Sequence, residues 1–188
     1  MGKQFSRIEP HHREFIERQR IFFNASATAE GHVNVSPRDV ATLRVMDANT
    51  VAYVDLTGSG NETAAHLRAD GRLTLMFCAF EGAPLVLRLY GQGRIVPRLS
   101  TEYAALLAAH FDNAAPPGVR QMVMLEVELV QASCGMNVPF FDYVGERDQL
   151  TRWAEAKGEK GLEEYWHLKN ERSIDGFPTG MLEETPSR

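Results

Sequence analysis

The sequence is poor in lysine. Its four lysines are Lys3, Lys157, Lys160 and Lys169, so the middle of the chain carries its positive charge on arginine alone. Any anion-binding site there must therefore use arginines, hydroxyl groups or backbone N–H groups. The formal net charge of −5 provides no electrostatic attraction for nucleic acid, and we expect no nucleic-acid partner.

Cysteines and long apolar runs are also scarce. The two cysteines, Cys78 and Cys134, are too few for a disulfide framework, and no Cys/His spacing fits a zinc site, so we expect no bound metal. No apolar stretch approaches the length of a membrane span, and the first residues lack the apolar segment of a secretion signal. These absences predict a protein of the reducing cytoplasm without a membrane partner.

The length of 188 residues and the 44% of hydrophobic residues predict one domain with a real core. We expect this domain to span residues 1–188. It should include an N-terminal helix at about 10–20 and a C-terminal helix plus tail at about 148–188, with a break near Gly158 or Gly161.

Alternating apolar residues predict about six strands, at 21–28, 33–37, 50–56, 73–80, 85–97 and 121–132. Two further helices are expected at about 61–69 and 101–110. Pro37 should end or bulge its strand, and Gly91 and Gly93 should let theirs bend. Because most turns are short, the strands should pair antiparallel. The prediction is a mainly β protein with peripheral helices, closed or nearly closed into a barrel.

A glycine-rich loop in "DLTGSGNETAAHL", residues 55–67, joins a predicted strand to a helix. It has neither the lysine of a nucleotide-triphosphate loop nor the third glycine of a dinucleotide fingerprint. Ser59 and Glu62 fit a capping box. Thr57, Ser59 and Asn61, together with the free N–H groups of the helix start, are able to bind one phosphate. The alternative is an ordinary capped helix with a glycine-rich approach.

A second candidate for anion binding is Arg38, which should project near the end of its strand, with Arg44 as another option. The alternative is that these arginines are solvated or paired with a carboxylate such as Asp55. No nucleophile elbow or hydrolase triad is present, so no catalytic acid, base or nucleophile is identified.

Three segments carry a resemblance to a known family. The stretches "VNVSPRD", "YVDLTGSGNETAAHLRADGRLTLMF" and "LRLYGQGRIV" resemble the pyridoxamine 5′-phosphate oxidase-like flavoproteins over roughly residues 11–135. The C-terminal stretches "SCGMNVP", "WAEAKGEKGLEEYW" and "SIDGFPT" are similar to a bacterial branch of that family without an assigned substrate. The resemblance rests on the order and spacing of these segments.

The resemblance implies a split β-barrel that forms a homodimer, binds FMN at the dimer interface and acts on a small molecule. Contacts to the phosphate are expected from Arg38, Thr57, Gly58, Ser59, Gly60, Asn61 and Thr63. Contacts to the flavin ring and ribityl chain are expected from Val35, Ser36, Pro37, Tyr53 and Asp55. From the partner chain we expect Arg88, Tyr90, Trp166 or the "SIDG" segment to close the pocket.

One departure limits what the resemblance implies. The true oxidases carry a serine and two basic residues at the helix start, where this sequence has Asn61, Glu62 and Thr63. We therefore expect an FMN-dependent oxidoreductase with another substrate than pyridoxamine phosphate. The alternatives are a non-catalytic flavin-binding protein, for storage or sensing, and a split barrel that uses a deazaflavin or haem.

Overall fold

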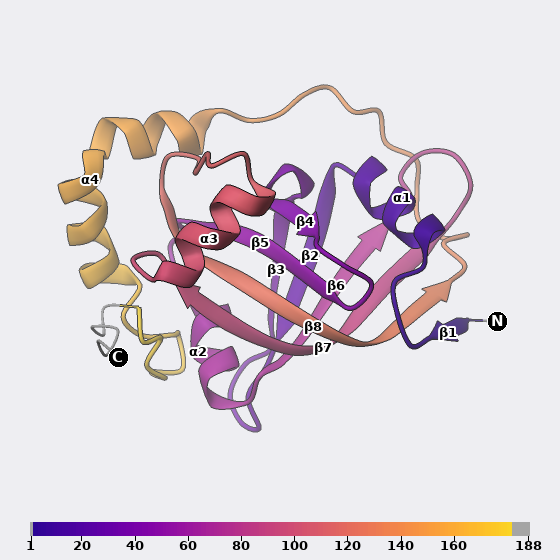
Figure 1. Ribbon diagram of the computed structural model, residues 1–188, viewed down its shortest axis with the longest axis horizontal. Coiled ribbons are helices and arrows are strands. Elements are labelled where there is room, and N and C mark those ends of the chain that lie inside the picture. Colours follow the sequence, from indigo (N-terminus) through magenta and orange to yellow (C-terminus); the bar gives the residue numbers. More distant parts are fainter. Residues whose placement is uncertain (1, 182–188) are drawn as a thin grey trace.

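The strands form one curled antiparallel sheet in the computed structural model, which describes residues 2–181 (Figure 1). The eight strands are β1 (Lys3–Phe5), β2 (Ile21–Ser26), β3 (Asn34–Asp39), β4 (Leu43–Val45), β5 (Thr50–Leu56), β6 (Arg72–Cys78), β7 (Val86–Pro97) and β8 (Val119–Ser133). Their order is β3-β2-β6-β7-β8-β5-β4, and β1 pairs with β8. The predicted mainly β, antiparallel fold is confirmed.

Two of these strands, β1 and β4, were not predicted, because three residues are too few to show alternation. The expectation that Pro37 ends or bulges its strand is wrong. β3 continues to Asp39, and Pro37 stays in register opposite Phe23. β3 is the last strand of the sheet order, so the missing N–H of proline removes no ladder hydrogen bond on its outer side.

The long strand β7 bends at Gly91, as expected. The pairing of β7 with β8 shifts register between Tyr90 and Gly91. A Cβ atom at Gly91 would collide with the backbone carbonyl of Glu126, so only glycine allows this close approach.

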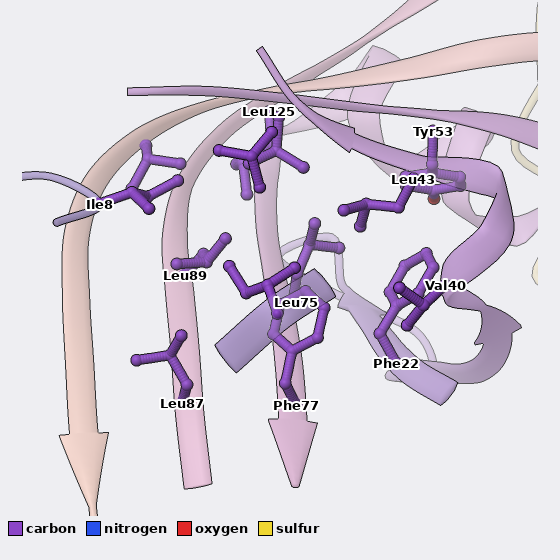
Figure 2. Packing of buried hydrophobic residues seen from close by; sticks show 14 of the residues in the cluster. Ile8, Phe22, Val40, Leu43, Tyr53, Leu75, Phe77, Leu87, Leu89 and Leu125 are labelled. Carbon is purple, nitrogen blue, oxygen red and sulfur yellow. The ribbon is translucent and has the colours of Figure 1, made fainter. Parts of the chain in front are cut away.

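The helices are α1 (Pro10–Arg18), α2 (Glu62–Ala69), α3 (Thr101–His110) and α4 (Gln149–Lys169), and a 3₁₀ turn spans Val40–Thr42. The main core lies between the sheet and α1, and includes Phe22, Tyr53 and Phe77 (Figure 2). A second cluster packs α3 against the opposite side of β5, because Ala52 and Val54 alternate with Val51 and Tyr53. None of the helices in residues 2–181 is long and apolar enough to cross a membrane.

The C-terminal part wraps around the sheet. Residues 134–148 form no helix or strand and arc from the end of β8 to the start of α4 (Figure 1). α4 contains a kink at Gly158, where φ is 64° and ψ is 174°, which confirms one of the two predicted break points. Residues 170–181 then return to the α2 side of the molecule, and residues 182–188 of the predicted tail lie outside the described residues.

Candidate functional site

The glycine-rich loop leads into α2, but the predicted capping box is wrong. The helix begins at Glu62, its N-cap is Asn61, and no side chain caps the first turn. Glu62 does not fold back toward Ser59. Its carboxylate instead accepts the backbone N–H of Ile174, at 3.0 and 3.1 Å. The acidic residue at the helix start therefore holds the C-terminal segment.

α4 covers this loop from the same chain. The indole N–H of Trp166 donates to Oγ1 of Thr57 at 2.8 Å, and Thr57 donates to the carbonyl of Gly118 at 2.7 Å. Trp166, which was expected to close the pocket of a partner chain, contacts the loop of its own chain in this structure. Trp166 packs on its own chain because the apolar side of α4 places it beside Ala154 and Leu162.

Asn170, just after α4, fixes the loop more tightly. Its side-chain amide donates to the carbonyl of Gly58 at 3.1 Å and accepts from Nη1 of Arg120 at 3.0 Å. Its own carbonyl accepts the hydroxyl of Thr179 at 2.7 Å. Because Asn170 is fully buried with these groups satisfied, the C-terminal segment is an integral part of the loop's surroundings.

A cluster of three charged side chains lies beneath the loop. Nε of Arg120 donates to Oδ2 of Asp55 at 2.8 Å, and Nη1 of Arg38 lies 2.9 Å from Oδ1. Oδ1 accepts no hydrogen bond from the described residues, so the Arg38 contact is an ion pair without hydrogen-bond alignment. The side chains of Arg38, Arg120 and Asp55 are 19%, 2% and 0% exposed. Of the two expectations for Arg38, pairing with Asp55 is the one observed.

Burial alone would raise the pKa of the Asp55 carboxyl, but the charges of Arg120 and Arg38 outweigh it and hold the pKa below its ordinary value. Burial raises the pKa of the neighbouring Tyr53 phenol. The carboxylate is therefore charged and the phenol neutral at neutral pH. Neither side chain reaches the surface, so Tyr53 and Asp55 cannot line a ligand directly, as was expected of them.

Neutral amides and hydroxyls connect the charged cluster to the rest of α2. Gln121 donates to both Asp55 and Asn61, at 2.8 and 2.9 Å. On the other side, Asn24 accepts from Nε of Arg38 and donates to Thr63, at 3.2 and 2.7 Å. Asn61 and Thr63 are thus already bonded within the protein.

A cleft of about 1510 Å³ opens beside this cluster. Its walls come from the α1–β2 junction, the ends of β3 and β5, the turn between β6 and β7, and residues 141–151. The residues nearest the cluster that line it are Pro37, Arg38, Val54, Leu56 and Thr57. Phe141 and Tyr143 also line it, and the guanidinium carbon of Arg20 lies 4.8 Å from the centre of the Tyr143 ring. The cleft combines apolar walls with charged side chains, which is typical of ligand pockets. The charged residues that line it are Arg18, Arg20, Arg38, Arg147, Asp39, Glu81, Asp142 and Glu146.

The structure brings only part of the predicted set to this cleft. Pro37, Arg38 and Thr57 line it, whereas Val35 is 60% exposed and Ser36 bonds to Asn34. Arg88 lies near the start of β7, where it donates to Ser133, and it is not among the residues that line the cleft in the single chain. Arg44, the other arginine considered, is held by backbone carbonyls, including that of His110. Among residues 2–181, no three His, Cys, Asp or Glu side chains are grouped to hold a metal ion.

Sequence reasoning missed Arg120 and Asn170. Arg120 stands at the predicted border of its strand, which was expected to begin at 121 but begins at Val119. The available signal was a charged residue directly before an apolar strand. Its partner, Asp55, is 65 positions away, and only the pairing of β5 with β8 brings the two together.

We expect Asp55→Asn to lower the free energy of unfolding by about 3–5 kcal/mol at pH 7, because it leaves Arg38 and Arg120 buried without a counter-charge. The pKa of Asp55 is lower in the folded chain, so its stabilising contribution is complete above its ordinary pKa of about 3.9 and declines as the pH falls below that value. The difference between wild type and Asp55→Asn should therefore shrink on acidification, measured by urea unfolding from pH 7 to pH 3.

The control is Asp148→Asn, which removes an exposed carboxylate 2.7 Å from Arg152 and should change little at any pH. A stability difference for Asp55→Asn that stays constant down to pH 3 would contradict the assigned ionisation.

Comparison with known proteins places these features in a family. Residues 8–134 match the family model described as Pyridoxamine 5'-phosphate oxidase. The pyridoxamine 5'-phosphate oxidase family protein ustO of Aspergillus flavus is 36% identical over 182 residues, which covers 88% of this chain and 73% of that protein.

Solved structures show the same fold at low sequence identity. A HupZ variant from Group A Streptococcus is 18% identical with a TM-score of 0.53, covering 67% of this chain and 99% of that one. A putative pyridoxamine 5'-phosphate oxidase from Lactobacillus delbrueckii is 14% identical with a TM-score of 0.52, covering 67% and 94%. HutZ, a heme storage protein from Vibrio cholerae, is 18% identical with a TM-score of 0.50, covering 69% and 98%. The fold is a split β-barrel, and the chain belongs to the pyridoxamine 5'-phosphate oxidase family.

Proposed function

We propose that this protein binds FMN in the cleft and is an oxidoreductase that acts on an unidentified small molecule. The observation that carries the proposal is Arg38 on the wall of the cleft. Nε and Nη1 of Arg38 face Asn24 and Asp55, while Nη2 has no hydrogen-bond partner among the described residues. A phosphate is the kind of group that such a guanidinium binds.

The cleft residues fit a flavin. Val54, Leu56 and Phe141 supply apolar surface for a planar ring, and Arg38 supplies a donor for an anionic group. The start of α2 fits a phosphate less well, because Thr57 and Asn61 are already bonded inside the protein. We therefore assign the phosphate to Arg38 and retain the loop residues Gly58, Ser59 and Gly60 as supporting structure.

In this proposal a bound flavin supplies the redox chemistry, and the protein supplies binding, orientation and exclusion of water. Trp166 and Asn170 hold the loop against the end of β5, which keeps one wall of the cleft in place. The oxidase's basic pair at the helix start is replaced by Glu62 and Thr63, so pyridoxamine phosphate itself is not the proposed substrate.

An absorption spectrum of the purified protein, followed by titration with FMN, tests the cofactor. We expect flavin bands near those of free FMN and stoichiometric binding. A haem Soret band would instead favour the storage role named for HutZ, although no histidine is among the described residues that line the cleft. Deazaflavin would be recognised by its own spectrum.

If the flavin binds but neither NADH nor NADPH reduces it, the protein is a flavin carrier or sensor and not an oxidoreductase.

Arg38→Ala should weaken FMN binding by about 1.5–3 kcal/mol, the contribution of a hydrogen bond to a charged group. Riboflavin, which lacks the phosphate, should bind nearly as before. Arg120 still neutralises Asp55 in this variant, so the fold should persist. Flavin fluorescence titration measures both ligands, and Arg72→Ala, an exposed arginine paired with Asp70 outside the cleft, is the control. Equal losses for FMN and riboflavin would contradict a phosphate contact.

We also propose that the protein is a homodimer with the cofactor at the interface. Large apolar side chains are exposed on the single chain, including Val35 at 60%, Phe140 at 79% and Val144 at 98%. A partner chain would cover such side chains and bring Arg88 and Tyr90 to a site that one chain does not reach. Light scattering should give twice the chain mass of 21.1 kDa. Val144→Glu should lower the measured mass toward that of a single chain. A monomer at micromolar concentration would contradict the proposal.

A further inference from the structure

The buried cluster beside the cleft does not balance its charge. Two arginines, Arg38 and Arg120, share one carboxylate, Asp55, so the group carries a net charge of +1. The other side chains that bond to it are the neutral amides of Asn24, Gln121 and Asn170. A buried charge without a counter-charge is costly, which makes the cluster a place where an anion is stabilised.

The two arginines have different partners. Arg120 donates to Asp55, to the carbonyl of Gly60 and to Asn170, and it is not among the residues that line the cleft. Arg38 lines the cleft, and its contact with Asp55 lacks hydrogen-bond alignment. Asp55 is held on Oδ2 by Arg120 and Gln121 together.

We infer that Arg120 is a positioning residue that gives the cleft its preference for an anionic ligand. Arg120 neutralises Asp55 from the side away from the cleft. The positive charge of Arg38 at the cleft wall is therefore left without a counter-charge. Without Arg120, Arg38 and Asp55 would form a neutral pair, and the guanidinium would have little charge left to offer a phosphate. The inference rests on the proposed binding of FMN in this cleft, and it names the residue that determines the selectivity.

Asn170 has a defined part in this arrangement. It lies beyond residues 8–134, where the family model matches, yet its Oδ1 is 3.0 Å from Nη1 of Arg120. Because an amide is neutral, it satisfies the guanidinium without cancelling its charge. An aspartate of nearly the same shape at this position would bring the net charge of the cluster to zero.

The experiment compares the dissociation constants of FMN and riboflavin, whose ratio reports how strongly the phosphate is recognised. The variants are Arg120→Gln, Asn170→Asp and the double variant Asp55→Asn with Arg120→Gln, and Arg72→Gln is the matched surface control. We expect wild type and the control to prefer FMN. Arg120→Gln and Asn170→Asp should each lower the preference roughly tenfold or more, the equivalent of one charged hydrogen bond. The double variant restores the net charge of +1 and should regain the preference.

The rescue by the double variant separates charge from structure, because a purely structural role of Arg120 predicts further damage when Asp55 is also changed. Equal losses for FMN and riboflavin, or a preference that is unchanged in Asn170→Asp and Arg120→Gln, would overturn the inference while FMN binding stands. Asn170→Asp nearly preserves shape and provides the test if Arg120→Gln does not fold. Its loss of the hydrogen bond to the Gly58 carbonyl should affect FMN and riboflavin alike, so the ratio of their dissociation constants still reports the charge. A wild-type protein that binds no FMN would overturn the proposed function, and this inference with it.

Discussion

The burial of Asp55 is the constraint on which the rest of the site depends. A carboxylate with no exposed surface needs positive partners, and here they come from two strands, Arg38 on β3 and Arg120 on β8. Arg120 in turn bonds to the glycine-rich loop and to Asn170 after α4. One ionised group therefore couples the edge of the sheet, the strand that ends at the cleft, the loop and the C-terminal segment. Removing Asp55 would leave two arginines without a counter-charge, whereas either arginine alone still neutralises the carboxylate.

The glycine-rich loop differs from a phosphate cradle in the backbone groups that it uses. A cradle turns backbone N–H groups toward an anion, whereas in this chain the carbonyl of Gly60 accepts from the guanidinium of Arg120 and that of Gly58 accepts from the amide of Asn170. The loop contains no lysine, and the cation that contacts it comes from β8. Of the charged cluster around Asp55, the arginine that lines the cleft is Arg38, on a different strand.

Local pattern was sufficient to predict most of the fold. The long alternating strands β5, β7 and β8, the helix over Thr101–His110 and the kink at Gly158 each depend on residues close in sequence. The strands β1 and β4 have three residues each and carry no periodic signal. Less of the site could be predicted from the sequence. Arg38 and Thr57 were identified as local features, but the bonds from Asp55 to Arg120 and from Gly58 to Asn170 join residues 65 and 112 positions apart. Strand pairing and helix docking create these contacts, and a single sequence shows neither.

The capping box failed for a related physical reason. The spacing of Ser59 and Glu62 suits a reciprocal cap, yet Glu62 has a competing donor in the backbone N–H of Ile174, which the local sequence does not contain. The same competition explains the three positions where the family's oxidases carry a serine and two basic residues. Asn61 bonds to Gln121, Glu62 to Ile174, and Thr63 to Asn24 and Asn34. A basic side chain at 62 could not accept the N–H of Ile174, and basic residues at 62 and 63 would add positive charge near a cluster that is already positive. In the proposed function Arg38 supplies the anion contact in place of the helix start, and in the structure Glu62 holds the C-terminal segment instead.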